Sequence, residues 1–154
     1  MTEILHAGLV AARIGGAWRG ALIEGTSGTG KSDLALRCLG AGFSLVADDR
    51  VIVFAHGGAL WGRAPDPLYG LIEARGVGLI AVTPLPFARI ELAVDLAAAP
   101  DEVERLPDGA LRTLLGVAVP AVRLWPFEAA APAKLAALLH CGNVALVERL
   151  GDQL

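Results

Sequence analysis

The stretch Gly25-Thr26-Ser27-Gly28-Thr29-Gly30-Lys31-Ser32 has the pattern Gly-x-x-x-x-Gly-Lys-Ser of a phosphate-binding loop. Its glycines allow a tight turn in which backbone N–H groups converge on phosphate oxygens, and a helix that starts there adds its positive end. Lys31 is expected to reach the β- and γ-phosphates, and the Ser32 hydroxyl is expected to bind Mg²⁺. The sequence therefore predicts a nucleotide-binding protein that holds the phosphates of ATP, or of a close analogue, with residues 25–32.

Composition limits the classes of protein that need to be considered. The 154 residues predict one domain, and the 55% of hydrophobic residues predict a large core or a buried subunit interface. No apolar run reaches the roughly 18 residues that a membrane helix needs, and the start of the chain lacks the basic region of a secretion signal. We therefore expect a cytoplasmic protein with reduced thiols at Cys38 and Cys141. The net charge of −3 argues against a broad nucleic-acid-binding surface.

Patterns of apolar residues predict many strands and few helices around the loop. The predicted strands are Ile4–Ile14, Arg19–Glu24, Phe43–Ala47, Val51–Ala55, Ala59–Trp61, Gly78–Val82, Ala88–Leu96 and Val119–Trp125. Helices are predicted over Lys31–Leu39 and Ala131–Leu139, whereas Val144–Leu150 fits either a helix or a strand. Pro65–Leu71 is expected to be irregular, and Pro100–Gly109 to lie at the surface. This order favours an α/β fold with a mixed sheet over a regularly alternating doubly wound fold.

Two adjacent carboxylates, Asp48 and Asp49, end the apolar stretch 43–47. In phosphate-loop folds an aspartate at the end of a neighbouring strand typically serves Mg²⁺. A pair of carboxylates offers two roles, one near the metal and one near the attacking hydroxyl. The alternative is an aspartate pair that caps a turn before Val51, which position alone supports about equally well. The phosphate loop ahead of the pair favours the functional interpretation.

Three segments, in this order along the chain, resemble the HPr kinase/phosphorylase family. The first is residues 25–36, the second is Leu45-Val46-Ala47-Asp48-Asp49, and the third is Leu71-Ile72-Glu73-Ala74-Arg75-Gly76-Val77-Gly78-Leu79-Ile80, which is similar to the family signature Leu-Glu-Ile-Arg-Gly-Leu-Gly-Ile-Ile. A weaker match is Ile4-Leu5-His6-Ala7, similar to the His-Gly that opens the family's catalytic domain. The resemblance covers residues 1–154 as one catalytic domain and leaves the family's usual N-terminal domain without a counterpart. The chain thus resembles the short, catalytic-domain-only form of α-proteobacteria.

The resemblance implies a function and a site. Members of the HPr kinase/phosphorylase family use ATP and Mg²⁺ to phosphorylate a serine of HPr, a phosphocarrier of the sugar phosphotransferase system. The implied fold is a P-loop kinase domain with a mixed sheet, related to phosphoenolpyruvate carboxykinase and usually assembled as a hexamer. The implied site residues are Lys31 for phosphate, Ser32 and Glu73 for Mg²⁺, Asp49 as the base that takes the serine proton, and His6 and Arg105 at the active site.

One departure from the family concerns the reverse reaction. The family's Pro-x-Arg-Pro-Gly-Arg-Asn stretch is tied to dephosphorylation, and within residues 119–130 only Arg123 and Pro126 faintly resemble it. Weak or absent phosphorylase activity is therefore expected. The roles of Asp48 and Arg75 stay open, because Arg75 and Glu73 would alternate along one strand face and could form a simple ion pair.

Two other functions are compatible with a phosphate loop. A small-molecule kinase, such as a shikimate-type enzyme, would carry an arginine-bearing helical lid, and no such segment is recognisable. A nucleotide-binding sensor without catalysis is the second alternative, and Asp49, Glu73 and His6 argue against it. The three tryptophans are expected to pack in the fold instead of stacking on a base: Trp18, Trp61 and Trp125.

Overall fold

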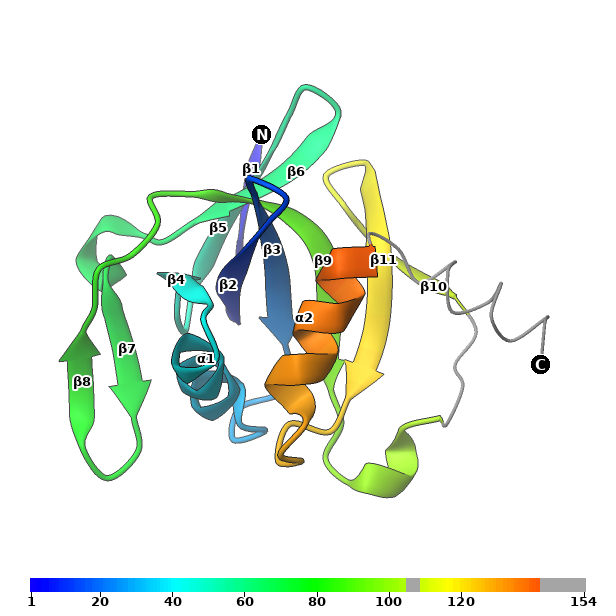
Figure 1. The fold of residues 1–154 in the computed structure, drawn as a ribbon. Coiled ribbons are helices and arrows are strands. Elements are labelled where there is room, and N and C mark those ends of the chain that lie inside the picture. The colour runs from blue at the N-terminus through cyan, green and yellow to red at the C-terminus, as the bar shows by residue number, and fades with distance from the viewer. Residues whose placement is uncertain (105–108, 142–154) are drawn as a thin grey trace.

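A computed structural model describes residues 1–104 and 109–141, which form a curled mixed sheet with two helices against one face (Figure 1). The strands are β1 (Thr2–Leu5), β2 (Ala7–Ile14), β3 (Ala17–Glu24), β4 (Ser44–Ala47), β5 (Val51–His56), β6 (Ala59–Arg63), β7 (Leu71–Ala74), β8 (Gly78–Ala81), β9 (Ala88–Leu96), β10 (Ala110–Leu114) and β11 (Val117–Leu124). The helices are α1 (Lys31–Gly40) and α2 (Ala131–Cys141), and short 3₁₀ turns occupy Asp66–Leu68 and Pro100–Glu102. The predicted α/β class with a mixed sheet is confirmed.

Strand β3 lies inside the sheet, and this position determines where the phosphate loop begins. The strand order is β1-β5-β6-β9-β3-β2-β4, and β11 also pairs with β9 and carries β10 on its other side. β3, β9 and β11 run parallel, whereas the other strand pairs of this sheet are antiparallel. The carboxyl ends of the three parallel strands therefore meet at one edge, which is where ligands bind in open α/β sheets.

The predicted strand Ile4–Ile14 is wrong as a single element, because the chain bends at His6. Before the bend, β1 pairs with β5, and Leu5 lies opposite Val51. After it, β2 pairs with both β3 and β4, and Ala7 lies opposite Glu24. An uninterrupted apolar pattern hides this change of partner, because both segments have strand-forming side chains.

Two further differences from the predicted elements lie near the site. The segment after residue 70, which carries the family-like signature, forms the separate two-stranded hairpin β7–β8. β11 starts earlier than predicted and pairs with β10, which the sequence patterns did not indicate. The predicted element Val144–Leu150 lies outside the described residues, as does part of the predicted surface segment 100–109.

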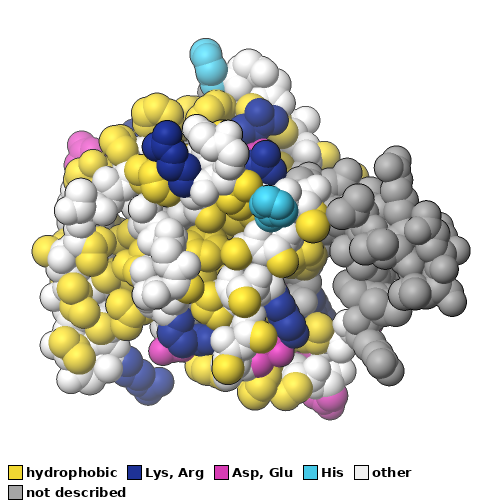
Figure 2. Space-filling model, viewed as in Figure 1, with side chains coloured by type: hydrophobic (Ala, Val, Ile, Leu, Met, Phe, Trp, Pro, Cys, Tyr) yellow, Lys and Arg dark blue, Asp and Glu magenta, His cyan; other side chains and the backbone are white. Residues whose placement is uncertain are grey.

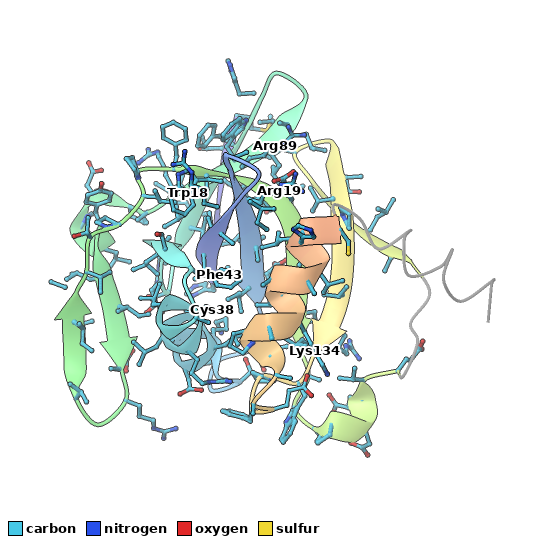
Figure 3. The ribbon with its side chains drawn as sticks, viewed as in Figure 1. Trp18, Arg19, Cys38, Phe43, Arg89 and Lys134 are labelled. Atoms are coloured by element: carbon cyan, nitrogen blue, oxygen red, sulfur yellow. The ribbon has the colours of Figure 1, made fainter. Side chains whose placement is uncertain are left out.

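Helix α1 is anchored by its apolar face. Leu34, Ala35 and Cys38 are buried against the sheet, and Cys38 and Phe43 lie in the same cluster of side chains (Figure 3). Burial raises the pKa of the Cys38 thiol to about 12, so this side chain stays protonated and acts as an apolar residue. Both cysteines are free, as expected, although Cys141 is exposed. Within the described ranges, neither helix is long and apolar enough to span a bilayer.

Candidate functional site

The phosphate loop connects the end of β3 to the start of α1, as the sequence predicts. Gly28 and Gly30 adopt left-handed backbone conformations, with φ of 83° and 98°, which side-chain-bearing residues rarely adopt. The Thr29 hydroxyl donates a 2.6 Å hydrogen bond to the carbonyl of Thr26, which closes the turn. Because Gly30 is the N-cap of α1, the free N–H groups of the first helical turn open onto the loop.

Lys31 is the first residue of α1, and its ammonium lies over the loop. Its Nζ donates to the carbonyl oxygens of Gly25 at 2.8 Å and Thr26 at 3.1 Å. The positive charge is thus held at the helix end that already favours anions. An incoming phosphate group would replace these carbonyls and accept a charge-assisted hydrogen bond from the Lys31 ammonium.

The strand end before the loop is held by an ion pair. Arg112, on β10, donates to both carboxylate oxygens of Glu24 at 3.0 and 3.1 Å. This hydrogen bonding raises the pKa of the Arg112 guanidinium, which stays charged. Glu24 directly precedes Gly25, so β10 supports the backbone from which the phosphate loop departs.

Asp48, directly after β4, joins three elements of the site. Its carboxylate accepts hydrogen bonds from the Ser32 hydroxyl, at 2.9 and 3.0 Å, and from the backbone N–H of Glu73 at 3.0 Å. It is 3% exposed and is the one buried charged side chain among the residues that the structure describes. The sequence left its role open, and the structure places Asp48, not Asp49, against the serine of the phosphate loop.

The pair of Ser32 and Asp48 fits Mg²⁺ as a ligand set. Mg²⁺ prefers oxygen donors and usually takes one or two protein carboxylates together with water and phosphate oxygens. Across residues 1–104 and 109–141 no three His, Cys, Asp or Glu side chains converge as a complete metal cage. A hydroxyl and a carboxylate in contact beside a phosphate loop are donors that suit a metal bound together with a nucleotide.

Asp49 has a different environment from its neighbour. It has a φ of 68°, unusual for a residue with a side chain, and its carboxylate is 63% exposed. The Arg50 guanidinium lies 2.7 Å from Asp49 Oδ2. The left-handed conformation turns successive carboxylates to different sides, so that Asp48 is buried on Ser32 while Asp49 stays open to solvent. Local strain of this kind is a recognised feature of functional sites.

A cavity of about 580 Å³ brings most of the predicted site residues together. Its lining contains Ser27, Gly28, Gly30, Lys31, Ser32, Asp49 and Glu73 of the predicted set, and also Asp33, Leu36, Ala74, Arg75, Val77 and Phe127. Glu73 is exposed on β7, whereas Arg75 lies in the turn after it, and no ion pair joins the two among the described residues. The simple ion-pair interpretation of these two residues is therefore wrong.

His6 is not part of this cavity lining. His6 is exposed at the bend between β1 and β2, beside the end of β3 and the start of the phosphate loop. Arg105 lies outside the described residues, so its predicted place at the site stays a prediction.

One feature of the site has no sequence motif. The loop between β11 and α2 is tied to α1 by Arg37, which donates to the backbone carbonyls of Pro126 and Glu128. This places the ring of Phe127 against Gly30, where an added Cβ would come within 2.8 Å of the ring. Gly30 is thus required by both its positive φ and this close approach, a contact that only the fold reveals.

The buried position of Asp48 gives a testable expectation for stability. Asp48→Ala should lower the free energy of unfolding by about 1–3 kcal/mol, because the Ser32 hydroxyl and the Glu73 N–H lose their acceptor. Asp49→Asn should cost less than about 1 kcal/mol, since that carboxylate faces solvent and asparagine tolerates the left-handed backbone of this position. Urea unfolding followed by tryptophan fluorescence measures both values. Equal stability of the two variants would contradict the described role of Asp48.

Comparison with known proteins identifies the family. A family model described as HPr Serine kinase C-terminal domain matches residues 3–135. The chain belongs to this family. The matched range includes the phosphate loop, both aspartates and the β7–β8 hairpin. The residues that line the cavity therefore all lie within the matched range.

Relatives support the same assignment. HPr kinase/phosphorylase of Limosilactobacillus reuteri is 44% identical over 114 residues, which cover 67% of this chain and 36% of that protein. The enzyme of that name from Streptococcus thermophilus is 52% identical over 67 residues, covering 43% of this chain and 22% of that protein. The chain thus matches only about a third or less of their lengths. A solved Hpr(Ser) kinase/phosphatase from Coxiella burnetii has the same fold, with a TM-score of 0.75, 23% identity and 99% coverage of both chains.

Proposed function

We propose that this protein is an ATP- and Mg²⁺-dependent protein kinase that phosphorylates a serine of an HPr-like phosphocarrier. The observation that carries the proposal is the contact between Ser32 and the buried Asp48 beside Lys31. The exposed Asp49 lines the same cavity, in a chain of the HPr serine kinase family. Phosphate binding, metal binding and proton transfer thus have separate candidate residues.

In the proposed reaction the serine oxygen attacks the γ-phosphorus, and the bond between that phosphorus and the β–γ bridging oxygen breaks. Lys31 and the N–H groups at the start of α1 stabilise the negative charge that shifts onto the leaving phosphate. Asp49 accepts the proton of the serine hydroxyl. Bound Mg²⁺ would neutralise part of the phosphate charge, with Ser32 and Asp48 as its protein ligands.

The other predicted residues have supporting roles in this proposal. Glu73 is the further contact for Mg²⁺, since it lines the cavity and its own N–H binds Asp48. His6 would contact the acceptor segment from the rim, because it is exposed beside the start of the loop. Arg105 keeps its proposed place at the active site from the family resemblance alone.

Phosphoryl transfer to a carrier is the decisive test. The protein is incubated with ATP, Mg²⁺ and the HPr-like carrier of its own organism, and the carrier is weighed by mass spectrometry. A carrier that gains one phosphoryl group, mapped to a serine, supports the proposal. ATP turnover with small hydroxyl compounds but an unmodified carrier would favour the small-molecule kinase, and nucleotide binding without any transfer would favour the sensor.

Reverse activity is proposed to be weak. Arg123, one of the two residues that faintly resemble the family's dephosphorylation stretch, pairs with Asp95 at 3.0 Å. Its guanidinium is therefore engaged on the sheet, away from the cavity lining. Incubating phosphorylated carrier with inorganic phosphate should release little pyrophosphate, and rapid release would contradict this part of the proposal.

We expect the protein to act in the cytoplasm as a homo-oligomer, with six subunits favoured. Large apolar side chains are exposed on several elements, including Val77 at 77% and Leu79 at 69% on the β7–β8 hairpin. Figure 2 shows apolar side chains spread over the face that carries the helices and this hairpin. Burial of such surface is the usual driving force for association. Light scattering at micromolar concentration should give a mass several times 15.9 kDa, and a monomer would contradict the expectation.

A further inference from the structure

We propose that Phe127 forms the wall on which the base of the bound nucleoside triphosphate stacks. This inference rests on the proposed function, because it places the nucleoside base of ATP at the end of the cavity that the phosphates do not occupy. Nothing in the motif Gly25–Ser32 recognises a base, so the nucleoside needs contacts from another segment. The loop between β11 and α2 supplies an aromatic side chain, Phe127, that meets Gly30 of the phosphate loop and lines the cavity.

The position of Phe127 is determined by contacts on both sides of its loop. Arg37 of α1 holds the carbonyls of the residues before and after it, Pro126 and Glu128. The ring meets Gly30, the last residue before Lys31, and lines the same cavity as Lys31 and Ser32. A ring held at this place adjoins the path of a phosphate chain that is bound by the loop.

The two flanks of α1 differ in chemistry, which gives the nucleotide a direction. The β7–β8 hairpin lies on one side of α1, and the start of α2 with the β11–α2 loop lies on the other (Figure 1). The hairpin side carries Glu73 and its contact with Asp48, so the transferring phosphoryl group belongs there. The nucleoside end must then extend toward the opposite flank, where Phe127 lies.

The Phe127 side chain is also suited to stacking. It is 54% exposed although it is aromatic, and its ring is held edge-to-face against Trp125 with centroids 6.3 Å apart. Such an edge contact limits rotation of the ring and leaves area free for a ligand. Stacking on an aromatic ring tolerates any base, because every base has a π-face. Trp125 supports the ring by packing, the role expected for the tryptophans of this chain.

Comparison of two ligands tests this assignment. Calorimetry with Mg²⁺ measures the affinities of ATP and of inorganic tripolyphosphate, which has the phosphates but no nucleoside. Phe127→Ala should weaken ATP binding by about 5- to 100-fold and leave tripolyphosphate binding unchanged. Phe127→Leu keeps an apolar side chain against Gly30 and should show a similar selective loss, whereas Phe127→Trp should retain ATP affinity.

Phe87 offers a matched control, because it is similarly exposed, at 56%, and also meets a tryptophan edge-to-face, Trp61 at 5.9 Å. Phe87→Ala should change neither affinity. Unchanged ATP affinity in Phe127→Ala would overturn the inference, and so would an equal loss for both ligands, which would make Phe127 a support of the loop. If the unmodified protein bound neither ligand, the proposed function itself would fail.

Discussion

Replacement of Asp49 by asparagine is expected to slow phosphoryl transfer to the carrier serine about 10²–10⁴-fold while Mg²⁺–ATP affinity stays near normal. A serine hydroxyl is a poor nucleophile at neutral pH, and its proton must leave during transfer. The Asp49 carboxylate is exposed and lines the cavity next to Lys31, so it can reach a hydroxyl brought in by a carrier. Asparagine keeps the size and tolerates the left-handed backbone of this position, but it cannot accept the proton.

For Asp49→Asn, quenched-flow measurements give the rate of phosphoryl transfer, and calorimetry gives the affinity for Mg²⁺–ATP. Asp48→Asn is the informative comparison, because Asp48 contacts Ser32 and is buried. The Asp48→Asn variant should mainly need a higher Mg²⁺ concentration. At saturating Mg²⁺ its transfer rate should fall less than that of Asp49→Asn. If Asp49→Asn transferred phosphate at the normal rate, or failed only because ATP no longer bound, Asp49 would be a metal-binding or structural residue.

Lys31→Ala is expected to lower transfer by about 10²–10³-fold and to weaken Mg²⁺–ATP binding, because a fixed positive charge is removed from the developing phosphate charge. The fold should persist. Lys31 lies at the start of α1, where, within the part of the chain that the structure describes, its ammonium bonds to the loop carbonyls of Gly25 and Thr26. Circular dichroism and thermal unfolding check the fold, and calorimetry checks the affinity.

Lys134, the other lysine of the chain, is the control for this substitution (Figure 3). It lies on α2 and pairs with Glu128 at 2.7 Å in an exposed ion pair, which contributes at most about 1 kcal/mol to stability. Lys134→Ala should therefore leave affinity and transfer close to normal. Unchanged affinity together with unchanged turnover in Lys31→Ala would remove the basis for the phosphate-loop assignment.

The phosphate loop and α1 could be predicted from sequence because each depends on residues close together in the chain. Gly28, Gly30 and Lys31 specify the turn and the helix start, and the apolar stretch before Asp48 specifies β4. The choice between two adjacent aspartates could not be predicted, since it depends on the positive φ of Asp49 and on the position of Ser32 across the site. The sequence identified the pair, and only the fold distinguishes its members.

Non-local pairing explains the remaining differences. The bend at His6 arises because β1 and β2 find partners in different parts of the sheet, β5 for one and β3 with β4 for the other. The place of Phe127 at the site could not be predicted, because its contact with Gly30 joins residues that are far apart in the sequence. The apolar pattern predicts that a strand exists, but its neighbours follow from the topology.

The parallel pairing of β3 with β9 has a consequence for folding. Ala21 lies opposite Leu92 and Glu24 opposite Asp95, so the strand that leads into the phosphate loop is completed by a segment synthesised much later. Contacts of such long sequence separation form late, because the entropy of closing the intervening loop opposes them. A nascent or truncated chain that contains the whole loop motif but lacks residues 88–96 should therefore be unable to hold nucleotide, and recovery of ATP binding during refolding should track formation of the whole sheet instead of its first hairpin.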